Sequence, residues 1–207
     1  MGPFSPVVEA LPRSGIREVM EFAAGREGVI HLEVGEPSFA TPDHIVAAAF
    51  AAARAGHTRY TANAGIPELR QAVAERTAAR WGQPVAPTEV LVAVGAVNAI
   101  FATLVALVGE GDEVLIPDPG WPNYAAQVPL ARAVTARYPL RPENGYLPDL
   151  ADLDAAASPR TRVLILNNPA NPTGAVWHRE TVAAVAAWAS RRDLWVIADE
   201  IYEDLVF

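Results

Sequence analysis

Acidic, amide and aromatic side chains directly follow apolar segments at several places in this sequence. The clearest case is Asp199, which ends the apolar run Leu194–Ala198 and stands three residues before Tyr202. Short apolar runs rich in Val, Ile and Trp are typical of buried strands in parallel sheets, whose carboxyl ends bind ligands. A buried carboxylate needs a partner, and this run contains no lysine or arginine. We therefore expect Asp199 to pair with a protonated ring nitrogen of a ligand or, alternatively, to cap the following turn.

A second candidate is Asn171, in the segment NNPANPTG at residues 167–174. The segment follows the apolar run Val163–Leu166, and its two prolines stiffen a turn that would hold Asn171 at the carboxyl edge of the same sheet. An amide donates a hydrogen bond to an oxyanion or accepts one from a hydroxyl group, which suits it to orient an oxygen atom of a ligand. The alternative is that these asparagines only stabilise the turn.

Two weaker candidates lie earlier in the chain. Gly95, Ala96 and Val97 connect an apolar segment to the start of an expected helix. Free main-chain amides at a helix N-terminus bind anions such as phosphate, although a tight turn explains the same glycine. Trp121 lies in the loop PDPGWPNY after another apolar segment, where it either offers a flat face to an aromatic ligand or fills the edge of the core.

The segments that would position these residues alternate between two hydrophobic patterns. Apolar runs predict strands at residues 29–34, 89–95, 113–119, 133–138, 163–166 and 194–198. Helical periodicity and capping signals predict helices at residues 14–24, 41–56, 67–81, 95–108, 121–131 and 179–190, and a short helix after Pro148. This alternation predicts an α/β fold, a mostly parallel sheet flanked by helices on both faces. Met1–Pro12, with three prolines and no periodicity, is expected to be an extended arm.

Composition narrows the class of protein. The 207 residues are 51% hydrophobic and carry a net charge of −8, which predicts a large core and disfavours nucleic acid as a partner. The absence of cysteine excludes disulfides, thiolate nucleophiles and cysteine metal sites, and we expect no metal. No apolar run approaches the roughly 18 residues of a membrane-spanning helix, and Met1–Ala10 lacks the pattern of a secretion signal. We therefore expect a cytoplasmic protein without a membrane partner.

Five blocks of the sequence, in order, resemble the class I/II aminotransferases, fold-type I enzymes that use pyridoxal 5'-phosphate. The blocks are GEPSFATP, YTANAGIPELR, EVLIPDPGWPNY, SPRTRVLILNNPANPTG and VIADEIYEDLVF. The resemblance extends from Ser14 to Phe207 and implies the α/β fold of the large domain of these enzymes. It implies that residues 1–45 are an N-terminal arm and small-domain segment, and that residues 46–207 are the first part of the large cofactor-binding domain.

The resemblance also implies roles for the candidate residues in holding the cofactor. Asp199 would pair with the protonated pyridine nitrogen, which keeps the ring an electron sink. Asn171 and Tyr202 would donate hydrogen bonds to the phenolic oxygen, and Trp121 would stack on the ring. The main-chain amides of residues 95–97 would bind the phosphate.

Three further residues take roles from the resemblance alone. Tyr60 matches a tyrosine that reaches the phosphate of the neighbouring subunit, so its presence implies a homodimer. Gly35 would lie near the substrate carboxylate and Ile16 near the substrate side chain, although packing explains both residues equally well. Family members often carry a hydroxyl residue in the phosphate turn, whereas Ala96 and Val97 have none.

The lysine of this family, which forms the Schiff base with the cofactor, would lie downstream of Tyr202. All 16 lysine and arginine residues of this sequence are arginines, and arginine cannot replace an amine nucleophile because it stays protonated. We therefore expect an N-terminal portion of a longer transaminase acting on an amino acid and a 2-oxo acid, with no catalytic residue in this chain. A β-lyase of the same fold, and a non-catalytic remnant or cofactor-binding module, stay open as alternatives.

Overall fold

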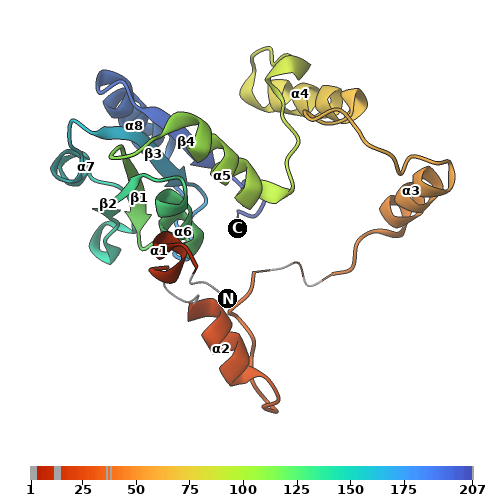
Figure 1. The fold of residues 1–207 in the computed structure, drawn as a ribbon, viewed down its shortest axis with the longest axis horizontal. Helices are drawn as coiled ribbons and strands as arrows, with labels where there is room; N and C mark the ends of the chain where they lie inside the picture. Colours follow the sequence, from red (N-terminus) through yellow and green to blue (C-terminus); the bar gives the residue numbers. More distant parts are fainter. Residues whose placement is uncertain (1–3, 12–14, 36, 38, 207) are drawn as a thin grey trace. The chain divides into compact units, whose positions relative to one another are not determined.

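The computed structural model describes residues 4–11, 15–35, 37 and 39–206 (Figure 1). The chain divides into two compact units. The first, which we call the sheet unit, comprises Met1–Pro12 and Val94–Phe207, and the second, which we call the helical unit, comprises Arg13–Ala93. The boundary predicted at residue 45 concerns the small and large domains of a whole enzyme and stays a prediction.

Four parallel strands form the centre of the sheet unit. They run in the order β2-β1-β3-β4, and their bounds are Glu113–Asp118 for β1, Val134–Pro139 for β2, Thr161–Asn167 for β3 and Trp195–Asp199 for β4. The two central strands, β1 and β3, are buried along almost their whole length, as their unbroken apolar sequences predict. The predicted parallel α/β fold is confirmed.

Successive strand residues point to opposite sides of the sheet, so the unbroken apolar strands place apolar side chains on both faces. Helices cover both of these faces. On one face, Val114 and Ile165 pack with residues of α5 (Gly95–Leu107) and α6 (Pro122–Leu130). On the other face, Leu115 and Leu164 pack with residues of α7 (Leu150–Ala156) and α8 (Arg179–Arg191). Each of these four helices lies where its sequence pattern predicts it, within a few residues at the ends. Figure 1 shows α5 and α8 running beside the sheet.

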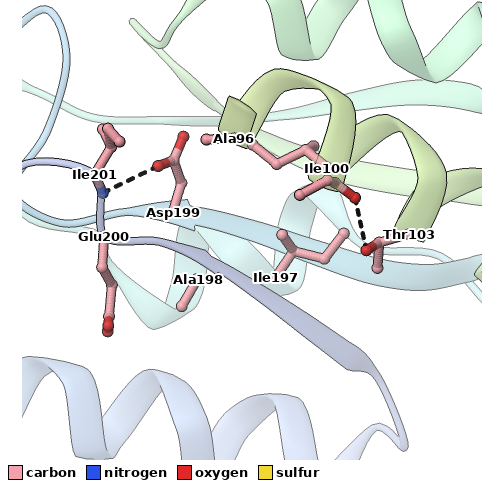
Figure 2. Close-up of a pocket in the computed structure, with 9 residues that line it drawn as sticks. Ala96, Ile100, Thr103, Ile197, Ala198, Asp199, Glu200 and Ile201 are labelled. Atoms are coloured by element: carbon pink, nitrogen blue, oxygen red, sulfur yellow. Dashed lines mark hydrogen bonds between the residues drawn. The ribbon is translucent and has the colours of Figure 1, made fainter. Parts of the chain in front are cut away.

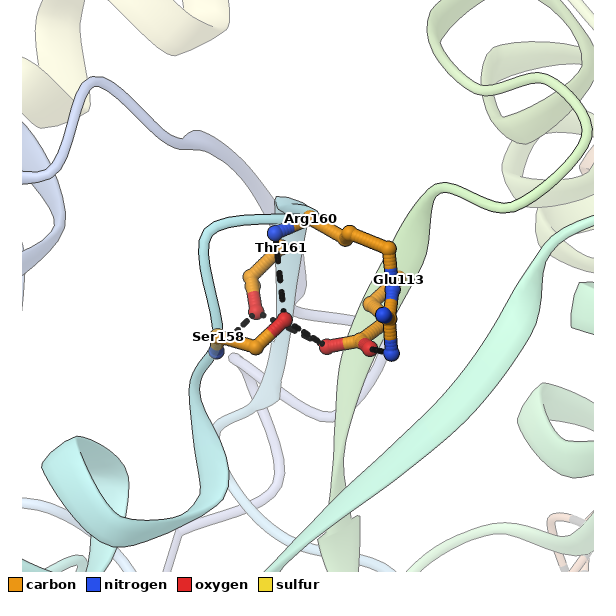
Figure 3. Close-up of polar contacts among 4 residues, drawn as sticks. All are labelled: Glu113, Ser158, Arg160 and Thr161. Carbon is orange, nitrogen blue, oxygen red and sulfur yellow. Dashed lines mark hydrogen bonds and ion pairs between the residues drawn. The ribbon is translucent and has the colours of Figure 1, made fainter.

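The amino ends of β1 and β3 are joined through Glu113, which is buried although it carries a charge. Its carboxylate accepts hydrogen bonds from the hydroxyl of Ser158 at 2.6 Å, from the guanidinium of Arg160 and from the hydroxyl of Thr161 at 3.4 Å (Figure 3). The Ser158 bond, followed by Arg160, holds the pKa of Glu113 below its ordinary value. This cluster ties the two central strands at the end opposite to Asp199.

The helical unit consists of α2 (Gly15–Ala23), α3 (Asp43–Arg54), α4 (Pro67–Trp81) and the single turn η1 (Pro87–Glu89). The predicted helix at 67–81 is confirmed, and it ends at Gly82, whose φ of 69° is the left-handed conformation that glycine adopts readily. The helix predicted from Ser14 begins among residues outside the described part, and the described helix starts at Gly15.

Three local predictions are wrong. Residues 29–34 and 89–95 are apolar but form no strand, since a strand needs a hydrogen-bonded neighbour and none pairs with either segment within the described residues. Pro6–Glu9 of the predicted extended arm forms the short helix α1. Its proline at the first helical position supplies the fixed φ that starts a helix.

The strand β4 is also less buried than its sequence predicts. Within the four described strands it is an edge strand with β3 as its neighbour, and the side chain of Trp195 is 58% exposed. Within β4, Ile197 is half-buried, and Asp199, which follows the apolar run, is the one buried residue. The η2 turn (Pro142–Asn144) completes the elements of the sheet unit. Among the described residues, no helix has the length and apolar character needed to cross a membrane.

Candidate functional site

Asp199 ends β4 with its carboxylate buried at the carboxyl edge of the sheet, and 8% of the residue is exposed. Oδ2 accepts a hydrogen bond of 2.5 Å from the hydroxyl of Tyr124. Oδ1 accepts one of 3.3 Å from the main-chain amide of Ile201, which Figure 2 shows. The second bond is the turn-capping contact considered above, so Asp199 does cap its turn. Both donors are neutral, so this buried negative charge is matched by a cationic ligand better than by its present neighbours.

Tyr124 is part of this site and was not predicted from the sequence. It lies in the first turn of α6, is fully buried, and packs edge to face against Trp121 with ring centroids 5.3 Å apart. Burial and the hydrogen bond to Asp199 raise the pKa of Tyr124, so its hydroxyl stays protonated and acts as a donor. Its position in the loop-to-helix segment PDPGWPNY, three residues after Trp121, was the available signal.

The NNPANPTG segment connects the predicted residues Asn171 and Tyr202 to Asp199 through Asn167. Asn167 ends β3 and is buried. Its side-chain amide donates to the carbonyl oxygen of Asp199 at 3.0 Å, and its Oδ1 accepts from the main-chain amide of Asn171 at 2.6 Å. The side chain of Asn171 in turn lies 3.5 Å from the hydroxyl of Tyr202, at the limit of a hydrogen bond. Asn171, Tyr202 and Asp199 therefore share one network at the sheet edge.

The first turn of α5 carries the predicted phosphate residues. Gly95, Ala96 and Val97 are exposed and open this helix, so their main-chain amides have no acceptor within it. Gly95 has a φ of 79°, which favours glycine at the entry to the helix. The buried side chain of Gln127 donates to the carbonyl oxygen of Val97 at 2.9 Å and so connects α6 to this turn.

A cavity of about 250 Å³ lies between α5 and β4. Ala96, Ile100 and Thr103 line it from α5, and Ile197 and Asp199 line it from β4. In Figure 2, Ala96 and the Asp199 carboxylate lie at the same end of this cavity. One end of the cavity thus presents a buried carboxylate, and close to it lies a helix N-terminus that favours an anion.

The other three predicted residues belong to the helical unit. Tyr60 lies in a loop and its side chain is completely exposed, Ile16 lies on α2 and is half-buried, and Gly35 is exposed outside any helix or strand. Glu36 lies outside the described residues, so the shape of the predicted turn at Gly35 stays a prediction. Trp121 is half-buried at the start of α6, with Tyr124 against it. The roles of all these residues toward a cofactor or substrate stay predictions.

The chain resembles known aminotransferases in both sequence and fold. The family model for aminotransferase class I and II matches residues 27–207. The chain is 41% identical to the aspartate aminotransferase of Pyrococcus horikoshii over 95% of this chain and 50% of that protein. It is 41% identical to the aspartate/prephenate aminotransferase of Thermus thermophilus over 88% of this chain and 48% of that protein.

Solved structures give the same match. The structure of the aspartate aminotransferase from Thermus thermophilus with maleate superimposes with a TM-score of 0.94 and 39% identity, over 100% of this chain and 55% of that chain. The aspartate aminotransferase from Thermotoga maritima gives a TM-score of 0.93 and 32% identity, over 98% of this chain and 55% of that chain. The chain spans about half the length of the curated relatives it matches.

Proposed function

The chain belongs to the class I and II aminotransferase family, and we propose that the whole protein transfers an amino group between an amino acid and a 2-oxo acid with pyridoxal phosphate as its cofactor. The observation that carries this proposal is the position of Asp199. Its buried carboxylate accepts hydrogen bonds from neutral donors and lines the same cavity as Ala96, in the first turn of α5.

The residues at the sheet edge fit the two charged ends of this cofactor. A protonated pyridine nitrogen is a cation, which complements the buried carboxylate of Asp199. A phosphate is an anion, which complements the free amides of Gly95, Ala96 and Val97. Because the side chains of Ala96 and Val97 carry no hydroxyl group, we propose that main-chain donors supply the phosphate contacts from this turn.

The remaining residues of the sheet unit would orient the ring. Asn171 and Tyr202 are proposed to donate hydrogen bonds to its phenolic oxygen, and Trp121 is proposed to stack on one face. The chemistry supplied by the bound cofactor is an electron sink for the pair of electrons left at the substrate Cα when its proton is removed. Asp199 keeps that sink effective by holding the proton at the ring nitrogen. No lysine occurs in this chain, and we place the Schiff-base lysine in the half of the relatives' length that the chain does not match.

A homodimer is part of the proposal through Tyr60. The side chain of Tyr60 is long and completely exposed, and we propose that its hydroxyl group binds the cofactor phosphate of a second subunit. Gly35 and Ile16 are proposed to lie near the carboxylate and the side chain of the substrate. We also propose that residues 1–45 are the arm and small-domain segment, and that residues 46–207 begin the large domain.

We propose aspartate as an amino donor. Curated relatives at 41% identity are named aspartate aminotransferase and aspartate/prephenate aminotransferase, and a matching solved structure holds maleate, a dicarboxylate like aspartate. Substrate preference is a property of the whole protein, so a panel of amino donors that includes aromatic amino acids is the appropriate measurement.

The reaction class is tested with the whole protein, pyridoxal phosphate, nitrogen-labelled aspartate and 2-oxoglutarate, with mass spectrometry of the products. We expect the label in glutamate and an equal amount of oxaloacetate. A β-lyase needs a substrate with a leaving group at Cβ, so a nitrogen-labelled cysteine conjugate is tested in parallel. Labelled ammonia and pyruvate from that conjugate, with no labelled glutamate from aspartate, would instead indicate elimination by a β-lyase. Saturating cofactor with no product from any amino donor would contradict the proposed transfer.

A further inference from the structure

The strongest polar contact that Asp199 makes comes from a residue to which no role has been given. The hydroxyl of Tyr124 lies 2.5 Å from Oδ2 of Asp199, against 3.3 Å for the bond from Ile201 to Oδ1. Hydrogen bonds from a hydroxyl group to a carboxylate at this distance are short and charge-assisted, and they are roughly twice as strong as bonds between neutral groups.

Tyr124 is held rigidly, so it can fix the group it contacts. Its main-chain amide donates to the carbonyl oxygen of Trp121 at 3.1 Å, which closes the first turn of α6. Its ring is fully buried in the core on the α5 and α6 face of the sheet, where it packs with Val114 and Val128. The residue therefore has little freedom to move its hydroxyl away from Asp199.

We propose that Tyr124 is a positioning residue for the cofactor: its hydroxyl fixes the orientation of the Asp199 carboxylate and stabilises its negative charge for pairing with the pyridinium nitrogen. This inference rests on the proposed function. A carboxylate oxygen accepts two hydrogen bonds, so the contact from Tyr124 leaves room for a ring nitrogen. Without the hydroxyl group, the carboxylate is oriented only by the longer bond from the Ile201 amide, and the carboxylate competes more strongly for the proton of the ring nitrogen.

The test compares two buried tyrosines in the whole protein. Tyr124→Phe removes the donor to Asp199. Tyr138→Phe removes a buried hydroxyl group that donates to the carbonyl oxygen of Ile165 at 3.0 Å and not to Asp199. Both substitutions keep the ring and its packing. The measurements are the affinity for pyridoxal phosphate and the NMR signal of its isotope-labelled ring nitrogen in the holoenzyme.

We expect Tyr124→Phe to weaken cofactor binding about tenfold or more, as loss of a hydrogen bond to a charged group does. The ring-nitrogen signal should move toward that of neutral pyridine, whereas Tyr138→Phe should leave both measurements at the wild-type values. In an Asp199→Asn background, Tyr124→Phe should have little further effect, because the two residues act as one unit.

The inference fails if Tyr124→Phe binds the cofactor with wild-type affinity and an unchanged ring-nitrogen signal. Equal losses in the two Tyr→Phe variants would also overturn it, since they would reflect packing alone. If wild-type protein shows no cofactor binding, the proposed function fails instead, so the two failures are distinct. Should Tyr124→Phe not fold, fluorotyrosine at position 124 keeps the shape and strengthens the donor, and the signal must then move toward pyridinium.

Discussion

The side chain of Asn167 bridges β3 and β4 by donating its amide to the carbonyl oxygen of Asp199 at 3.0 Å. The same side chain accepts the main-chain amide of Asn171 at 2.6 Å. One buried asparagine thus fixes the two main-chain segments that carry the proposed partners of the pyridine nitrogen and of the phenolic oxygen. Asn167, the first asparagine of NNPANPTG, therefore supports the positions of both Asp199 and Asn171.

Substituting Asn167 by leucine should both destabilise the protein and weaken the site. It leaves buried polar groups without their partner, and we expect a loss of about 2–4 kcal/mol in the free energy of unfolding. Urea unfolding of the whole protein measures this loss. Asn144→Ala is the control, because the side-chain bond from Asn144 to Leu147 is exposed. A change at Asn167 no larger than at Asn144 would refute the bridging role.

Glu113 should make the stability of the sheet unit depend on acid pH. The hydrogen bond from Ser158 and the ion pair with Arg160 lower the pKa of Glu113 in the folded state. Its contribution is therefore complete above the ordinary carboxyl pKa and is lost as the pH falls through the lowered value. Hydrogen exchange of the β1 amides across this acid range should show the loss in wild-type protein.

The substitution Glu113→Gln should remove part of that pH dependence and cost about 1–2 kcal/mol near neutral pH. The matched control is Glu110→Gln, whose ion pair with Arg132 joins two largely exposed side chains and should matter by less than about 1 kcal/mol. Identical acid profiles for wild-type protein and Glu113→Gln would show that the cluster in Figure 3 does not carry the effect.

Gly65 should tolerate no side chain. Its φ is 100°, and an added Cβ would lie 2.5 Å from Cγ2 and 2.7 Å from Cβ of Val92. Gly56 is a matched control, because its φ of 91° is also positive but no atom lies within 4 Å of an added Cβ. Gly56→Ala should cost about 1 kcal/mol from its backbone conformation alone, and Gly65→Ala should cost about 1–3 kcal/mol more from the clash. Equal costs in urea unfolding would rule out the clash.

The cross-subunit role of Tyr60 is testable by mixing two defective chains of the whole protein. Tyr60→Ala and Asp199→Ala should each bind the cofactor poorly as homodimers. If Tyr60 serves the partner's site, refolding them together in equal amounts should restore about a quarter of the wild-type sites, since random pairing gives half heterodimers with one intact site each. Cofactor titration counts those sites. No recovery would place Tyr60 and Asp199 in the site of the same subunit, or Tyr60 outside the site.

Most of the sheet unit was predictable from the sequence because its determinants are local. Strands β1 and β3 are buried on both faces and so are apolar at nearly every position, which a short window of sequence detects. In the helical unit, Pro67 and Gly82 gave the start and the end of α4 in the same way. Asp199, Asn171 and Tyr202 were predicted together because parallel strands bring their carboxyl ends to one edge.

Most of the predictions that failed depend on contacts between segments that are distant in the sequence. Residues 29–34 and 89–95 have the apolar content of strands, but pairing decides whether a strand forms, and no periodicity reveals the partner. The contact between Tyr124 and Asp199 joins residues 75 apart in sequence, so it depends on how α6 packs against the sheet. The apolar run Leu194–Ala198 predicts a strand, but it does not by itself tell a central strand from an edge strand, which is the position of β4 among the described strands.

Binding of pyridoxal phosphate to the whole protein carrying Asp199→Asn tests the central claim most directly. Asp118→Asn is the control, because Asp118 also ends a parallel strand but is exposed. The amide cannot balance the charge of a pyridinium ring, so Asp199→Asn should weaken binding by about tenfold or more and give a neutral ring nitrogen, while Asp118→Asn should match wild-type protein. Wild-type affinity and a protonated ring in Asp199→Asn would contradict the assignment of Asp199 as the partner of the cofactor.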